Sequence, residues 1–198
     1  GPVRQDAGLD EGLTGGALIS APRDAAPELR RYYKLATRLS TLLALASDIS
    51  MATVGGALKR KGALTGRLGD ILSQLFILSA TLKRFEDEGR PAEDLPFVHW
   101  AAQDALNRAA TAWRDVLANY PSRGAALFLK LTGTPFGLKA PTPGDACAGQ
   151  VAGLIQRHGP ARDRLVSGSG SASLEVDPIA AVLGAFDLYP RVGTIEAR

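Results

Sequence analysis

The strongest constraint on the fold of this chain is a run of apolar residues spaced alternately four and three positions apart in its middle. The run consists of Leu64, Leu68, Ile71, Leu75, Leu78, Leu82 and Phe85. Because side chains three and four residues apart lie on one face of an α-helix, this spacing predicts a long amphipathic helix. Such an apolar stripe has to be buried, so the chain needs further long helices or a partner to cover it.

Two more stripes of the same kind flank the first. The earlier one consists of Tyr32, Leu35, Leu39, Leu42, Ala46 and Ile49, and the later one of Val98, Ala102, Ala105, Ala109, Trp113, Val116 and Tyr120. Gly55 and Gly56 separate the first two stripes, and Gly89 and Pro91 separate the last two. Since glycine and proline end helices, the sequence predicts three long helices joined by short turns, with order beginning near Pro27.

The rest of the chain predicts shorter elements. Helices are expected at residues 125–131, 145–156, 160–166 and 179–188, with a Pro/Gly loop at 135–144 and a Ser/Gly-rich link at 167–173. No convincing stretch alternates with the period of a β-strand, so the expected fold is all-α, an antiparallel helical bundle. We expect a lead-in at residues 1–26, whose Gly1-Pro2 looks like a tag remnant, a bundle domain at 27–166, and a link with a terminal helix at 167–198.

Composition and charge exclude several classes of protein. Cys147 is the only cysteine, which excludes an internal disulfide and a cysteine-built metal site and suits the cytoplasm. The net charge is +3, but acidic residues are interspersed with the basic ones, so no nucleic-acid partner is expected. Residues 39–58 come nearest to a membrane span; Asp48 at their centre would cost roughly 2.5–3.5 kcal/mol on insertion, which favours burial in a soluble bundle.

No pattern of catalytic residues is present. His99 and His158 are far apart and neither has the spacing of a metal ligand, so we predict no catalytic, cofactor-binding or metal-binding residue in this chain. The acidic run at residues 86–88 is better explained as a solvated helix face than as a cation site, because consecutive side chains diverge around a helix.

Two sets of residues are candidates for contacts with other molecules. Lys59, Arg60 and Lys61 could meet an anionic membrane surface at about 1 kcal/mol per basic residue, or form a solvated turn. Trp100 and Trp113 lie thirteen positions apart, out of register on a helix, so at least one is expected at an edge or a domain interface. The stripes themselves form either the domain's own core or a surface for a partner.

Several segments resemble the large C-terminal domain of FadE-type bacterial acyl-CoA dehydrogenases. The similarity is carried by GGALKRK at 55–61, GRLGDILSQL at 66–75 and LKRFEDEGRP at 82–91, and it continues at 94–96, 99–101, 103–106 and 161–165 and upstream at 13–16 and 31–33. It covers roughly residues 13–166. The chain departs from the family at Gly62-Ala63, where a charged, helix-favouring pair is usual, and from Ser167 onward.

The resemblance implies a parent enzyme of fatty-acid β-oxidation that binds FAD. That enzyme would remove two hydrogens from Cα and Cβ of a fatty acyl-CoA, with a glutamate taking the α proton. Those parts would lie upstream, so no catalytic or flavin-binding residue is carried over, and this chain alone is expected to be inactive and free of cofactor. The implied role is an auxiliary domain that supports the upstream dehydrogenase domains, dimerises, or contacts the inner membrane peripherally. The alternative is an autonomous module that binds acyl chains, acyl-CoA or another protein.

Overall fold

The computed structural model describes residues 25–157, 159–167, 182 and 184–185, and all regular structure within these residues is helical. The expected all-α fold is therefore confirmed. The chain divides into two compact units, residues 1–147 and 148–198.

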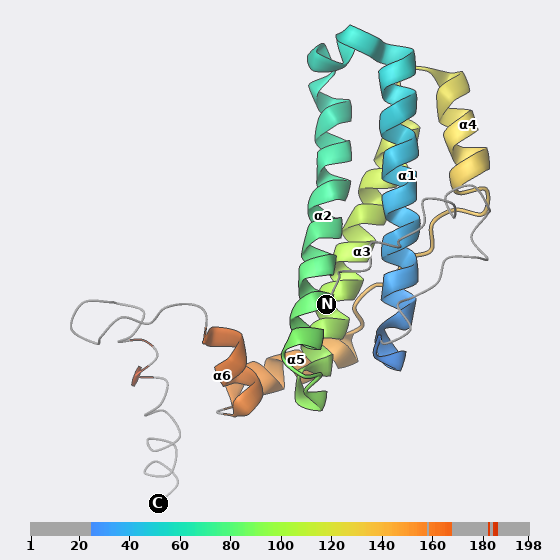
Figure 1. The fold of residues 1–198 in the computed structure, drawn as a ribbon. Helices are drawn as coiled ribbons and strands as arrows, with labels where there is room; N and C mark the ends of the chain where they lie inside the picture. Colours follow the sequence, from blue (N-terminus) through green and yellow to red (C-terminus); the bar gives the residue numbers. More distant parts are fainter. Residues whose placement is uncertain (1–24, 158, 168–181, 183, 186–198) are drawn as a thin grey trace, which may run out of the picture. The chain divides into compact units, whose positions relative to one another are not determined.

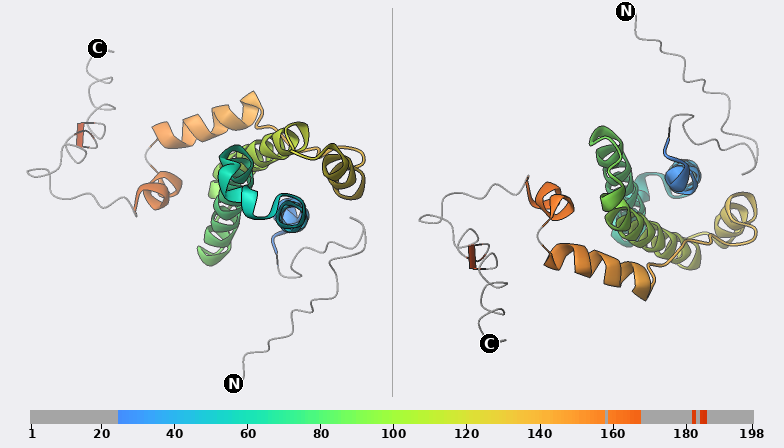
Figure 2. Two further views of the ribbon diagram at one scale, coloured as in Figure 1. Left: turned by 90° about the horizontal axis from the view of Figure 1, so that it is seen from above. Right: turned by 90° about the horizontal axis from the view of Figure 1, so that it is seen from below.

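The described residues up to Gly133 form four α-helices joined by short connections. These are α1 (Arg30–Val54), α2 (Gly62–Asp87), α3 (Leu95–Ala118) and α4 (Arg123–Gly133), with the 3₁₀ turns η1 (Pro27–Leu29), η2 (Gly55–Arg60) and η3 (Ala92–Asp94). The three long helices run up and down side by side, and α4 contacts α1 and α3 on the side away from α2 (Figures 1 and 2). The first unit is thus the expected antiparallel bundle.

The predicted stripes are the buried faces of the long helices. Every residue of the third stripe, which runs along α3 and ends at Tyr120 just beyond it, is buried, and the stripe residues on α1 and α2 are buried or half-buried. Ala102, Ala105 and Ala109 bring the backbone of α3 close to α2, where Leu78 and Leu82 fill the space beside them. Because α2 packs along so much of α3, the core lies mainly between these two helices, with one face of α1 closing it.

Glycines end the first two long helices, as predicted. Gly55 has φ +53° and ψ −135°, a conformation that residues with a side chain rarely adopt, and its amide donates to the Met51 carbonyl. Gly89 has φ +82° beyond the end of α2, where the Arg90 amide donates to the Phe85 carbonyl at 3.0 Å. These two turns fold the chain back on itself and make the long helices antiparallel.

The second unit contains most of α5 (Asp145–Gln156) and all of α6 (Pro160–Val166), both with the predicted bounds. The domain prediction grouped these helices with the bundle, whereas in the structure the division between the units falls after Cys147. The helix expected at residues 179–188 lies largely outside the described residues, of which Val182, Gly184 and Ala185 are helical.

Within the part of the chain that the structure describes, one helical stretch, Pro27–Leu58, is long and apolar enough by length and composition alone to cross a membrane. Only 17% of its most apolar window is buried. The buried side chains are those of the stripe, such as Leu39, Leu42 and Ala46, so α1 combines one core-facing side with a large exposed surface. That exposed surface includes the site described next.

Candidate functional site

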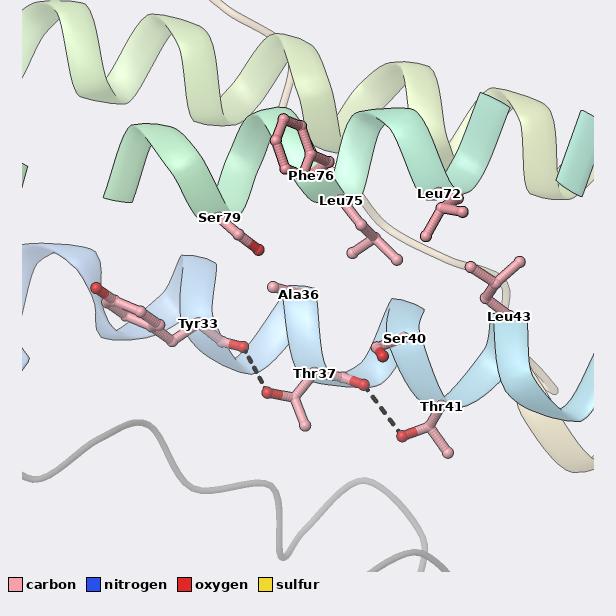
Figure 3. Close-up of a pocket in the computed structure, with 10 residues that line it drawn as sticks. All are labelled: Tyr33, Ala36, Thr37, Ser40, Thr41, Leu43, Leu72, Leu75, Phe76 and Ser79. Atoms are coloured by element: carbon pink, nitrogen blue, oxygen red, sulfur yellow. Dashed lines mark hydrogen bonds between the residues drawn. The ribbon is translucent and has the colours of Figure 1, made fainter. Parts of the chain in front are cut away.

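A groove with a volume of about 520 Å³ runs between α1 and α2 on the surface of the first unit (Figure 3). Its lining residues are Tyr33, Ala36, Thr37, Ser40, Thr41 and Leu43 of α1 and Leu72, Leu75, Phe76 and Ser79 of α2. The groove exists because α1 presents small side chains such as Ala36 and Ser40 toward α2. These small side chains leave space unfilled beside α2, which packs mainly on α3.

Large apolar side chains are exposed along this groove. Phe76 is 73% exposed and Leu72 is 59% exposed, and the neighbouring Ile77 is 47% exposed. Figure 3 shows Leu72 and Leu43 extending toward each other across the groove, while Leu75 points into it. Leu72 and Phe76 form a second apolar row beside the buried stripe of α2. The spacing of the α2 stripe does not reveal this row, because that spacing concerns only one face of the helix.

The polar groups of the groove offer little to a polar ligand. The Thr37 hydroxyl donates to the Tyr33 carbonyl at 2.9 Å, and the Thr41 hydroxyl donates to the Thr37 carbonyl at 3.1 Å (Figure 3). An adjoining hollow of about 450 Å³ shares Tyr33 and Phe76 and adds Lys83 at its edge. The groove is therefore a mainly apolar surface suited to apolar contact.

A polar cluster near the N-terminal end of α1 joins α1 to α3. The Tyr32 side chain is fully buried; its Oη accepts from Arg31 Nη2 at 2.6 Å and from Gln103 Nε2 at 3.0 Å, and it lies 2.9 Å from His99 Nδ1. Burial of the imidazole, aided by the positive charge of Arg31, lowers the pKa of His99, and the Glu28 carboxylate opposes this in part. Because the cluster's polar groups bond to one another, its role is to hold the two helices together.

Each acidic residue of the run at residues 86–88 forms an ion pair with a neighbouring basic residue. Glu88 pairs with Arg84 at 2.8 Å, Asp87 pairs with Lys83, and Glu86 pairs with Arg90. No group of three or more His, Cys, Asp or Glu side chains within the described residues could hold a metal ion.

The structure places the predicted basic residues at the turn between α1 and α2. The backbones of Lys59 and Arg60 lie in η2, Lys61 precedes α2, and the side chains of Arg60 and Lys61 are exposed. Their contact with an anionic surface stays a prediction.

The two tryptophans have different environments. Trp113 is 1% exposed, and its indole Nε1 donates to Thr134 Oγ1 at 3.1 Å, so it belongs to the core and not to an exposed interface. Trp100 is 37% exposed near the start of α3 and remains available for contacts. His158 lies outside the described residues.

Sequence comparison matches residues 8–198 to the family described as acyl-CoA dehydrogenase, C-terminal, bacterial type. The chain belongs to this family. It is thus a C-terminal domain of a multidomain acyl-CoA dehydrogenase, as the resemblance predicted, and the match extends beyond residues 13–166 at both ends. No solved structure matches the chain.

Acyl-CoA dehydrogenases use FAD, but the groove of this C-terminal domain does not have the character of a flavin site. A dinucleotide needs N–H donors or cations for its pyrophosphate. The lining of the groove contains no lysine or arginine, and the hydroxyls of Thr37 and Thr41 are bonded to their own helix. The residues that line the groove therefore do not fit FAD.

Proposed function

We propose that this C-terminal domain supports the upstream dehydrogenase domains of the β-oxidation enzyme by docking on them through the groove between α1 and α2. The observation that carries the proposal is the exposure of Phe76 and Leu72 beside an apolar groove on a bundle whose stripes are packed inside. Exposed apolar clusters of this kind mark surfaces that are covered in the complete protein. An apolar segment of the dehydrogenase domains would bury both side chains.

Acyl-chain binding in the same groove is the rival function, and the geometry favours it less. Sites for small ligands bury most of the ligand surface, roughly 70–90%, in an enclosed cavity. This groove is open to solvent between two helices, and the stripes that would have to enclose a lipid form the packed core instead. A protein surface fills an open groove better than a single acyl chain does.

The catalytic chemistry belongs, in this proposal, to the upstream domains. FAD bound there would supply the oxidation of the acyl-CoA, and a glutamate of those domains would take the α proton. This domain's contribution would be to cover an apolar part of the dehydrogenase body. Homodimerisation through the same groove would cover the same side chains and is an outcome of the experiment.

Calorimetric titration of this chain into the separately expressed dehydrogenase domains tests the proposal. We expect the wild type to bind and Phe76→Ser to bind about tenfold more weakly or worse. Burying a phenylalanine contributes about 1.5–3 kcal/mol, and each 1.4 kcal/mol changes the affinity about tenfold. The matched control is Phe136→Ser, an equal change at an exposed phenylalanine outside the groove, which should bind like the wild type.

Equal affinities of the wild type and Phe76→Ser would contradict the docking proposal. Co-purification of acyl species, detected by mass spectrometry and lost in Phe76→Ser, together with no binding to the dehydrogenase domains, would establish the rival function.

A further inference from the structure

Helix α4 carries apolar side chains on the face that points away from the bundle. Leu129 is fully buried against the bundle, while Leu127, Phe128 and Leu131 are 56%, 51% and 60% exposed. At roughly 100° per residue the three exposed side chains fall within an arc of about 100° opposite Leu129. A helix at the edge of a soluble bundle normally presents polar residues there, so this outer face is built to be covered.

The turn that follows α4 presents a further apolar side chain. Phe136 is 92% exposed at the third position of the turn Thr134–Gly137, in which the Gly137 amide donates to the Thr134 carbonyl at 2.9 Å. Thr134 is 2% exposed and accepts from the buried Trp113 indole. The turn is therefore fixed to the core, and Phe136 projects from a rigid base.

The charge of this part of the chain has one sign. No aspartate or glutamate occurs between Asp115 and Asp145, and the charged residues in that interval are Arg123, Lys130 and Lys139, all exposed. Apolar side chains flanked by cations, in a stretch of sequence without acidic residues, complement a surface that is apolar inside and negatively charged outside. Anionic phospholipid bilayers have that character.

We propose that α4 and the Thr134–Gly137 turn, together the α4 surface, bind the surface of an anionic lipid bilayer. Leu127, Phe128, Leu131 and Phe136 enter the boundary between headgroups and acyl chains, and the flanking cations contact the phosphates. The side chains of Lys130 and Lys139 are long enough to keep their ammonium groups at headgroup level while the leucines and phenylalanines are buried. This surface is separate from the groove between α1 and α2, so the inference does not depend on the docking proposal.

Co-sedimentation of the chain with vesicles of phosphatidylglycerol and phosphatidylethanolamine tests the inference. We expect the wild type to bind these vesicles, to bind less when salt is raised, and to bind pure phosphatidylcholine vesicles much more weakly. Phe128→Ser and Phe136→Ser should each reduce the partition coefficient roughly tenfold, since each removes one buried aromatic ring.

The matched control is Phe76→Ser, which makes the same change at an exposed phenylalanine of the groove and should leave vesicle binding unchanged. All three phenylalanines are at least half exposed, so the variants should retain the helical content and thermal midpoint of the wild type, which circular dichroism checks.

Three results would overturn the inference. The first is the absence of binding to the anionic vesicles, and the second is equal loss in Phe76→Ser and Phe136→Ser. The third combines two observations: vesicle binding is absent, and light scattering shows a wild-type dimer that Phe128→Ser dissociates. That result would assign the α4 surface to a second copy of the chain.

Discussion

At the scale of single residues, the hydrogen bonds around Tyr32 explain why a neutral His99 suits the fold. Arg31 and Gln103 both donate to the Tyr32 hydroxyl oxygen and use its lone pairs, which leaves the phenolic proton for His99 Nδ1. Protonation of the ring would place an N–H where an acceptor is needed. This adds to the effects of burial and of Arg31, which lower the pKa of His99.

Protonation of His99 should therefore destabilise the domain in mild acid. In the unfolded chain the pKa is about 6.5 and in the folded domain it is lower, so stability is fully present above about pH 6.5 and is lost as pH falls toward the folded pKa. Urea unfolding of the wild type and His99→Gln measures this. We expect the wild type to lose more stability than the variant between about pH 7 and pH 5. Parallel pH profiles would contradict this explanation.

The same scale shows what the sequence did and did not indicate about Trp113. Trp113 is part of the stripe on α3, three residues from Val116 and four from Ala109, so its periodicity indicated burial. The interface expectation rested on its distance from Trp100, and that distance carries no information on which of the two faces the core. The structure supplies the answer through the Thr134 contact.

At the scale of elements, α4 is held to the bundle by a close approach at its C-terminal end. The Gly133 carbonyl accepts from Arg38 Nη2 at 3.3 Å. A Cβ at this glycine would lie 2.4 Å from Leu42 Cδ2 and 3.7 Å from Trp113 Cζ2. Only glycine leaves room for the two core side chains here.

Gly133→Ala should consequently destabilise the domain by about 1–3 kcal/mol, because the buried Leu42 has to move in a packed core. Gly124→Ala in the same helix is the control, since its Cβ would meet only Ser122 Oγ at 4.0 Å. There we expect no loss and a gain of up to about 1 kcal/mol from helix propensity. Equal effects of the two substitutions in chemical denaturation would show that the close approach at Gly133 is unimportant.

The helices themselves could be predicted from sequence, but the surfaces between them could not. Helix periodicity and end signals such as Gly55, Gly89 and Pro160 are local, so they place α1, α2, α5 and α6 well. The groove depends on how far α1 stands from α2, and the apolar outer face of α4 depends on which side of that helix meets the core. Both are set by contacts between distant parts of the chain.

At the scale of the whole molecule, the domain should carry no flavin when it is separated from the rest of the enzyme. The groove lacks groups for a pyrophosphate, so the purified chain should show no flavin absorbance and no acyl-CoA-dependent reduction. Absorbance spectroscopy before and after addition of FAD and an acyl-CoA checks this. Stoichiometric flavin that an acyl-CoA reduces would place catalytic machinery in this chain.

The central claim is that this family member is a docking domain, and the most direct test is light scattering of the chain alone and mixed with the separately expressed dehydrogenase domains. We predict a single species whose mass is that of a defined complex, because the groove beside Phe76 is covered on binding. Two separate species with the masses of the free components would contradict the claim and would indicate an autonomous module.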